Sequence, residues 1–305
     1  MNPILALIIA NIIWGMAAPI FKFSLQNIPP FTLAFIRFFF AGLIFVPFVI
    51  NKWQPLTIRQ WIEIILVGFF GVTINISFFF LGLSKTDSIN APIIASAGPI
   101  FIYLLSVLLL KEKPKLKVLT GMLVGLLGVL IIIMTPIFLG QKKIIFGEVE
   151  GNLFFLLATI GTVIQTIIGK NVLKKVNSFQ VVFISFLFGS LTFLPFVRSE
   201  LINWNIFNDL DIRGAIGIVF GVFFSSALAY YLYYWGISKL KAQEVGLFAY
   251  IDPVIAVLIA IPLLGEHPNI YFLVGSLFVF GGIYLAEGRL HWHPFHKLKK
   301  INDRI

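Results

Sequence analysis

The sequence has no cysteine and few charged residues for its length. The absence of cysteine from all 305 residues excludes disulfides, thiolate metal sites and a cysteine nucleophile. Charged side chains make up 12% of the chain and hydrophobic ones 59%, whereas a soluble domain carries roughly 25% charged residues. Water does not suit a surface of this composition, but lipid does. The composition therefore predicts an integral membrane protein.

Ten apolar segments are each long enough to cross a hydrocarbon core of roughly 30 Å. None alternates with period two, and open sheet edges cannot be satisfied in lipid, so an all-α fold of ten transmembrane helices is predicted. No basic segment precedes the first one, which favours a span over a cleaved signal peptide. The segments lie near residues 4–23, 31–50, 62–83, 89–110, 117–139, 151–170, 179–197, 214–236, 243–264 and 269–287.

The net charge of +10 is distributed unevenly between the two sides of the predicted bundle. If both termini are cytoplasmic, sixteen of the 23 Lys and Arg residues fall on the cytoplasmic side, six fall on the other side, and Arg37 lies within a span. The positive-inside rule therefore predicts a multi-pass protein of the cell (plasma or inner) membrane with both termini in the cytoplasm. The basic segments indicate contact with an anionic inner leaflet, and no nucleic-acid partner is expected.

The two halves of the chain match each other in register. A shift of 154 residues aligns the punctuation residues of the later spans, and a shift of 148 aligns those of the earlier ones. The matched pairs include Lys22/Lys170, Phe38/Phe186, Pro99/Pro253, Glu112/Glu266, Gly121/Gly275 and Gly128/Gly282. Such agreement over a long stretch indicates an internal repeat.

Each repeat contains five spans, so the second must enter the membrane upside down. We predict one five-helix repeat over residues 1–143, a second, inverted five-helix repeat over 144–290, and a basic cytoplasmic tail over 291–305. Inverted repeats about an axis in the membrane plane are typical of secondary transporters, because two such units can exchange inward-open and outward-open states.

The chain resembles the drug/metabolite transporter superfamily, in particular its ten-helix EamA-type members, over nearly its whole length. The residues that carry the resemblance are Trp14-Gly15, Pro19, Lys22, Arg37-Phe38, the stretch from Pro99 to Glu112 and its repeat from Pro253 to Glu266. Together they are specific for the superfamily and unspecific for substrate. The resemblance implies a central cavity lined by spans one, three, four, six, eight and nine, with spans five and ten at the periphery.

These features predict a secondary active transporter of small organic metabolites that works by alternating access, with export preferred. The alternatives are an uptake permease, an exchanger or a passive channel. An enzyme is not expected, because the chain carries no hydrolase, kinase, nucleotide or zinc motif and Asp252 with Arg37 makes a poor catalytic set. No metal or organic cofactor is expected, although coupling to protons is open.

Asp252 lies near mid-membrane, directly before Pro253, and its counterpart in the first repeat is Gly98. A carboxylate at this depth normally faces a cavity or a partner. It is a candidate for proton coupling or for binding a substrate ammonium group. The alternatives are that it caps a broken half-helix or pairs permanently with Arg37. For Arg37 the resemblance favours a structural role.

Polar and aromatic residues within the spans are candidates for the cavity wall. Aromatic walls with a few amides suit a small amphipathic metabolite such as an amino acid. Individually, such polar side chains often only join neighbouring helices, at about 0.6 kcal/mol each. The predicted substrate-binding set is Asn11, Trp14, Asn75, Phe79, Ser96, Gln165, Tyr230, Tyr234, Tyr250 and Asp252.

Three peripheral features receive structural interpretations. Glu112 and Glu266 end their spans, so we expect them to anchor loops with no need for burial. The glycines of the fifth span predict close packing with another helix or with a second protomer, which leaves a monomer or a homodimer open. The histidines of residues 291–297 are expected to belong to a lipid anchor and not to a metal site.

Overall fold

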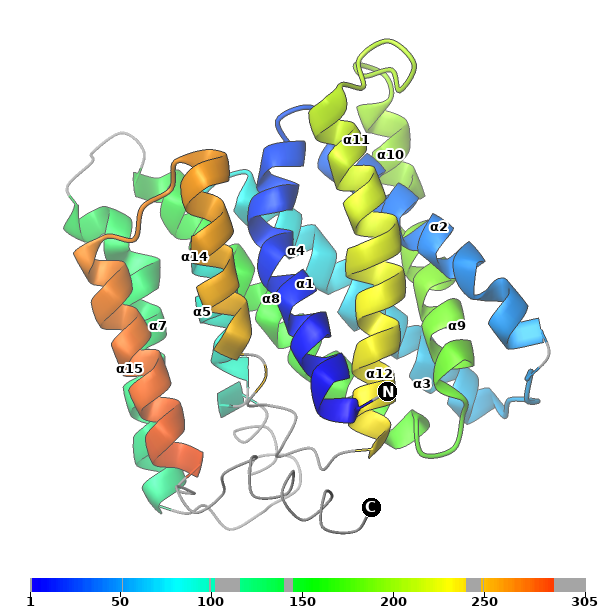
Figure 1. The fold of residues 1–305 in the computed structure, drawn as a ribbon, viewed down its shortest axis with the longest axis horizontal. Helices are drawn as coiled ribbons and strands as arrows, with labels where there is room; N and C mark the ends of the chain where they lie inside the picture. Colours follow the sequence, from blue (N-terminus) through cyan, green and yellow to red (C-terminus); the bar gives the residue numbers. More distant parts are fainter. Residues whose placement is uncertain are drawn as a thin grey trace.

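A computed structural model describes the chain over residues 2–50, 52–98, 100–101, 116–139, 145–239, 248 and 250–287. The described residues form helices joined by short turns, and they contain no strand. The end of the bundle at which α1 begins is here called the proximal end, and the opposite end, where α1 finishes, the distal end (Figure 1). The predicted tail and Glu112 lie outside the described residues.

The helices of the first repeat include two long regular ones and one span that changes helix type midway. That third span has a π-helical segment between two α-helical ones. The elements are α1 (Pro3–Ser24), α2 (Pro30–Ile50), α3 (Ile58–Gly68), η1 (Phe69–Ile74), α4 (Asn75–Leu83), α5 (Asn90–Ser96) and α7 (Leu116–Phe138).

The helices of the second repeat follow the same order. Its third span again contains a π-helical segment, and its second span bends by 44° between two helices. The elements are α8 (Ile145–Val172), α9 (Ser178–Leu191), α10 (Leu194–Glu200), α11 (Ile212–Val219), η2 (Phe220–Leu228), α12 (Ala229–Lys239), α14 (Ile251–Leu264) and α15 (Ile270–Glu287).

All ten predicted segments contain helix in the described residues, which confirms the all-α membrane fold. Six helical runs are long and apolar enough to cross a membrane, and the bent pair α9–α10 makes a seventh. α14 and α15 are shorter apolar helices, and the fourth segment is described only as far as residue 101. The number of ten crossings therefore stays a prediction.

The two repeats are related by an inverted pseudo-two-fold arrangement. Gly128 of α7 lies against Gly275 of α15, and their repeat counterparts Gly282 and Gly121 meet in the same way. A contact that recurs with its partners exchanged is the property of a two-fold axis. The glycines of the fifth span thus pack on α15 of the same chain, at one edge of the bundle (Figure 1).

Large aromatic side chains fill the middle of the bundle. Phe38 of α2 and its repeat counterpart Phe186 of α9 pack edge to face, with ring centroids 5.0 Å apart. Both are fully buried, as are Phe21, Phe80 and Phe155. Edge-to-face pairs at this distance stabilise the bundle beyond the area that they bury. The core therefore lies where the repeats meet.

Replacing Gly282 by alanine is expected to lower the thermal unfolding temperature of the purified protein in detergent. The added methyl group overlaps the backbone of Gly121 and Gly125, and overpacking of this kind costs about 1–3 kcal/mol. The neighbouring Gly281 is a matched control, because a methyl group there meets no atom within 4 Å. Gly281→Ala should leave the unfolding temperature unchanged or raise it slightly, since alanine is the better helix former. Equal unfolding temperatures for the two variants would contradict this packing.

Candidate functional site

Asp252 lies in the first turn of α14, at the point where α1 crosses closest to that helix. A methyl group added at Gly15 of α1 would lie 2.8 Å from the Asp252 carbonyl oxygen and 2.7 Å from the Ile255 Cβ. Only glycine permits this approach. Within the described part of the chain, the Asp252 Oδ1 atom is buried and has no hydrogen-bond partner. Buried polar atoms without partners are rare, and each one calls for an explanation.

The arrangement at Asp252 departs from the repeat symmetry in an informative way. The pseudo-two-fold counterpart of the Gly15–Asp252 contact is the pair Val163 of α8 and Gly98, two residues after the end of α5. In that second crossing, a Cβ added at Gly98 lies 3.8 Å from the Val163 side chain. The glycine is therefore on α1 in one crossing and just after α5 in the other. The carboxylate of Asp252 therefore has no counterpart in the first repeat.

A group of aromatic rings, here called the central aromatic cluster, connects α1 with α12 beside Asp252. Trp14 packs against Tyr230 and Tyr233, with centroid separations of 5.2 and 4.9 Å. Tyr234 continues the group, 6.1 Å from Tyr230 and 5.9 Å from Tyr233. Tyr233 also interacts electrostatically with Asp252. The cluster therefore comprises four rings with polar tips, of which Tyr233 interacts with the carboxylate.

Two amides extend this region towards α8. Gln165 forms a hydrogen bond with the Tyr234 side chain and lies against Gly71 of η1. The Asn75 amide donates to the Ala158 carbonyl at 2.9 Å and to the Thr162 hydroxyl at 2.7 Å. The predicted residues of spans three, six and eight are therefore connected by contacts, with the π-helical segment η1 between them.

Arg37 is held by serine hydroxyls and by phenyl rings. Its Nε donates to the Ser226 hydroxyl at 2.7 Å and its Nη2 donates to the Ser225 hydroxyl at 2.9 Å. The guanidinium lies 4.7 Å from the Phe21 ring centroid and 4.6 Å from that of Phe38. No ion pair joins Arg37 to Asp252 among the described residues. The permanent pair considered from the sequence is therefore not observed.

Four predicted residues lie away from the central aromatic cluster or bond within their own helix. The Asn11 amide donates to the Leu7 carbonyl and the Ser96 hydroxyl donates to the Ile93 carbonyl. Tyr250 packs edge to face on Phe280. Phe79 belongs to a second group of rings nearer the distal end, 6.5 Å from Phe21 and 6.1 Å from Phe155. Their part in substrate binding stays a prediction.

Sequence reasoning missed Tyr233, Ser225 and Ser226. The spacing of Tyr230 and Tyr233 is that of neighbours on one helix face, so Tyr233 could have been found. The serines could not, because their role depends on the π-helical segment η2. Trp14 Nε1 donates to the Ser225 carbonyl at 3.1 Å, and Ser225 also accepts from Arg37. A π-helical segment alters the backbone register and is frequent at functional sites.

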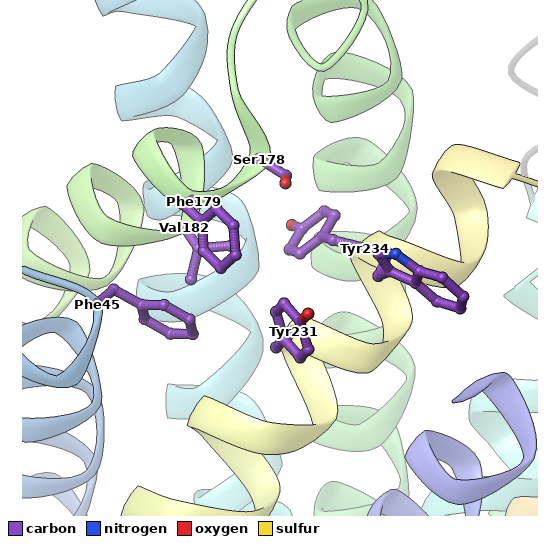
Figure 2. A pocket seen from close by; sticks show the side chains of 7 residues that line it. Phe45, Ser178, Phe179, Val182, Tyr231 and Tyr234 are labelled. Carbon is purple, nitrogen blue, oxygen red and sulfur yellow. The ribbon is translucent and has the colours of Figure 1, made fainter. Parts of the chain in front are cut away.

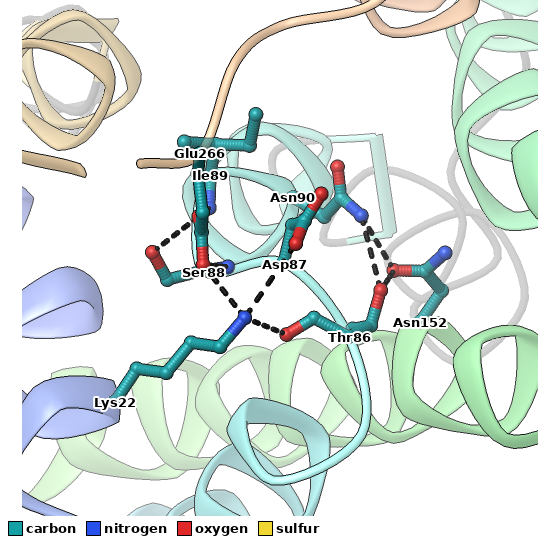
Figure 3. A network of polar contacts seen from close by, with 8 residues as sticks. All are labelled: Lys22, Thr86, Asp87, Ser88, Ile89, Asn90, Asn152 and Glu266. Atoms are coloured by element: carbon teal, nitrogen blue, oxygen red, sulfur yellow. Dashed lines mark hydrogen bonds and ion pairs between the residues drawn. The ribbon is translucent and has the colours of Figure 1, made fainter. Parts of the chain in front are cut away.

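At the distal end, a buried carboxylate joins the two repeats (Figure 3). Gly265, with a φ of 68°, ends α14 in the left-handed conformation, and Glu266 follows it. Glu266 is only 7% exposed, so the expectation that it needs no buried role is wrong, although it does anchor a loop. Its oxygens accept from the Lys22 ammonium at 2.6 Å, the Ser88 hydroxyl at 2.8 Å, and the backbone N–H groups of Ser88 and Ile89 at 3.0 and 3.2 Å.

The same network includes a second carboxyl group. Lys22 donates to the Thr86 carbonyl at 2.9 Å and lies 3.5 Å from the half-exposed Asp87. Partial burial and the nearby Glu266 carboxylate raise the pKa of Asp87, while Lys22 opposes the rise. Lys22 therefore interacts with two carboxyl groups, that of Asp87 from the first repeat and that of Glu266 from the second.

At the proximal end, a cavity of about 90 Å³ lies between α2, α9 and α12 (Figure 2). It is mostly aromatic, and Tyr234 belongs both to it and to the central aromatic cluster. The residues that line it are Phe45, Ser178, Phe179, Val182, Tyr231, Tyr234 and Trp235. Tyr234 thus connects the central aromatic cluster with this cavity, and the Glu266 network lies at the opposite end of the bundle.

Comparison with known proteins settles the family. The model of the EamA-like transporter family matches residues 1–134 and 149–287. The chain belongs to this family. An uncharacterized transporter of Archaeoglobus fulgidus is 27% identical over 277 residues, which cover 90% of this chain and 94% of that protein. The uncharacterized transporter YetK of Bacillus subtilis is 28% identical over 289 residues, which cover 94% of this chain and 87% of that protein.

More distant matches agree with this family. A WAT1-related chloroplastic protein of Arabidopsis thaliana is 26% identical over 282 residues, covering 90% of this chain and 66% of that protein. A protein of known crystal structure that is 19% identical in sequence superimposes on this chain with a TM-score of 0.62. The match covers 92% of this chain and 96% of that protein, which shows a shared fold. As an EamA-like protein, the chain is a membrane transporter. Its family and the names of its relatives point away from an enzyme.

Replacing Ser226 by alanine is expected to destabilise this EamA-like protein by about 1–3 kcal/mol, because the buried Arg37 Nε loses its acceptor. The measurement is thermal unfolding in detergent. Ser199→Ala is a matched control, since that hydroxyl is exposed and donates only to the Phe196 carbonyl of its own helix. If both variants unfold at the wild-type temperature, the serine does not hold Arg37.

Proposed function

We propose that the chain is a secondary active transporter of small organic metabolites, that it works by alternating access, and that it exports them. The observation that carries the proposal is the buried, unpartnered Oδ1 atom of Asp252 beside the central aromatic cluster. Trp14 and Asp252 come from different repeats, so a substrate held between them would touch both moving halves.

The chemistry of this region favours a substrate with an amino group and an apolar part. A carboxylate attracts an ammonium group, and the faces of Trp14 and the tyrosines stabilise a cation further. Gln165 and Asn75 supply amides at the edge of the region. An amino acid or related amphipathic compound meets these requirements.

Asp252 has a second possible role in the same proposal. A carboxylate that binds a proton on one side of the membrane and releases it on the other couples transport to the proton gradient. The absence of an ion pair with Arg37 among the described residues leaves Asp252 available for either role. No further cofactor is part of the proposal.

We further infer that the proximal end faces the cytoplasm of the cell and that the distal end faces outwards. In this orientation sixteen Lys and Arg residues lie on the cytoplasmic side and six on the outer side, which agrees with the positive-inside rule. The proximal cavity of about 90 Å³ would then receive substrate from the cytoplasm, as an exporter requires. An uptake permease or an exchanger is the alternative with the same architecture.

Asp252→Asn tests the proposed role of the carboxylate, because it keeps the shape and removes the charge. Purified protein in liposomes is expected to give saturable, counterflow-sensitive flux of at least one labelled amino acid, amine, sugar or nucleotide precursor. If Asp252 couples transport to protons, the variant should lose gradient-driven accumulation by more than about tenfold while exchange without a gradient persists. If Asp252 binds an ammonium group, affinity should fall in both assays.

The matched control is Asp209→Asn, because Asp209 lies in the exposed loop between α10 and α11 and its side chain accepts from the backbone N–H of Asn205 in the same loop. Its flux should equal that of the wild type. Normal transport by Asp252→Asn, with only a lower unfolding temperature, would show that the carboxylate is structural. Absence of flux for every compound class would count against secondary transport itself.

Cysteine labelling tests the orientation in this naturally cysteine-free chain. A membrane-impermeant thiol reagent should label Asn205→Cys, in the exposed distal loop, only from outside the cell. It should label Lys174→Cys, exposed at the proximal end between α8 and α9, only in inside-out vesicles. Labelling of residue 205 from inside alone would overturn the charge-based orientation.

A further inference from the structure

The hydrogen bonds of Glu266 occupy both oxygens of a buried carboxylate and connect segments far apart in the chain. Its donors come from the end of α1 and from the turn between α4 and α5, both in the first repeat, while Glu266 itself belongs to the second repeat. Charge-assisted hydrogen bonds of this kind are roughly twice as strong as neutral ones. The Lys22–Glu266–Ser88 contact, here called the distal latch, therefore fastens the two repeats to each other at one end (Figure 3).

The distal latch and Asp252 lie at opposite ends of α14. Gly15 and Lys22 are seven residues apart on α1, so they share one face of the helix and are separated by about 10 Å along its axis. Gly15 contacts the backbone of Asp252 and Lys22 contacts Glu266. Both ends of α14 are thus attached to the same face of α1.

Aromatic side chains fill the space beneath the distal latch. The Phe21 ring, next to Lys22 in sequence, lies 5.3 Å from the Phe80 ring and 5.6 Å from the Phe220 ring. Phe21 and Phe80 are fully buried. A substrate at Asp252 would have to pass these rings and the latch to leave distally, whereas proximally the central rings reach a cavity of about 90 Å³.

The residues of the latch can separate without unwinding a helix. Within the described ranges, the Glu266 side chain accepts hydrogen bonds from the Lys22 ammonium and from turn residues. The turn itself is also attached to α8, because the Thr86 hydroxyl and the Asn90 amide both donate to the Asn152 side chain. When Glu266 is released, the turn therefore stays in place on α8.

The repeat counterparts of the turn residues have a different chemistry. In the second half of the sequence, Ser88 is replaced by Ala242 and Asp87 by Lys241, although Lys22 and Glu266 have the counterparts Lys170 and Glu112. Ala242 has no hydroxyl to donate. The set of donors that holds Glu266 is therefore not repeated in the sequence. Glu112, the counterpart of Glu266, cannot receive the hydroxyl hydrogen bond that Ser88 gives to Glu266.

We propose that the distal latch is a releasable closure: it holds the distal end shut, and Glu266 must leave Lys22 and Ser88 each time that end opens. This inference rests on the proposed alternating access and names the contacts that set its equilibrium. Because the latch is built from one buried carboxylate, loss of the charge at residue 266 shifts the population towards the distally open state.

Ala18→Cys is a suitable reporter for this opening. Ala18 lies between Gly15 and Lys22 on α1, and it is 3% exposed. A membrane-impermeant thiol reagent applied to the distal side should label the thiol introduced at residue 18 slowly in the otherwise native chain. Glu266→Gln should increase the labelling rate about tenfold or more, as expected for the loss of a charge-assisted hydrogen bond. Ser88→Ala, which removes one donor, should give a smaller increase.

Glu150→Gln is the matched control. Glu150 accepts from Lys85 at 2.8 Å in an ion pair that also joins the repeats at the distal end but is exposed, so it contributes little. Its labelling rate should stay within about twofold of the reference. Unchanged rates in both Glu266→Gln and Ser88→Ala would overturn the proposal and make the contact a permanent clamp.

The labelling assay needs no substrate, which separates this inference from the proposed function. Faster labelling of Glu266→Gln without any measurable flux would support a distal closure but count against transport. If transport is measured but the labelling rates of the latch variants are unchanged, the proposal of a releasable latch is overturned and the proposed transport function stands. If Glu266→Gln does not fold, Lys22→Gln and Ser88→Ala decide the question, since each breaks the same contact from the other side.

Discussion

The fold depends on close approach of helices at points where a glycine replaces a side chain. In α7 and α15 the glycines of both repeats meet, so the contact between Gly128 and Gly275 recurs as the contact between Gly121 and Gly282. Where α1 crosses α14, Gly15 meets the Asp252 backbone, but the equivalent crossing has Val163 against Gly98. In lipid no hydrophobic force drives helices together, so such tight contacts determine where they cross. The symmetric contact holds the periphery, and the asymmetric one creates the site.

The polar groups at the centre of the bundle fall into two classes. Arg37 is buried but has two serine hydroxyls and two phenyl rings, and the Trp14 indole has the Ser225 carbonyl. These contacts satisfy the polar atoms and fix η2 against α1 and α2. The Oδ1 atom of Asp252 has no such partner in the described residues. A buried polar atom without a partner costs free energy, so the presence of this carboxylate is not explained by a contribution to the stability of the fold.

Much of the fold could be predicted from the sequence, because composition, span length and repeat register are properties of the chain itself. Asp252, Trp14, Tyr230 and Tyr234 were also among the predicted residues, and the spacing of Tyr230 and Tyr234 places them on one helix face. The contact of Trp14 with Tyr230 depends on the packing of α1 against α12 and could not be predicted. The burial of Glu266 could not be predicted. It depends on a left-handed turn at Gly265 and on Lys22 and Ser88, which are distant in sequence. The serines that hold Arg37 were missed for the same reason, since the helical register of η2 is a property of the folded bundle.

The two attachments between α1 and α14 differ in a way that matters for movement. At Gly15 the glycine meets the Asp252 backbone and the Ile255 Cβ, so the contact depends on close packing and not on a polar side chain. At Lys22 the contact is between a long flexible ammonium side chain and a carboxylate carried by the turn after α14. Under the proposed alternating access, the first contact suits a pivot and the second suits a catch, because an ion pair between side chains can break without any change in the backbone of either helix. Asp252 lies at the first of these contacts. Under the alternating access proposed above, a charge there would keep its distance from α1 while access to it changed from one end of the bundle to the other, which is the condition that a single binding site must meet to serve both sides of a membrane.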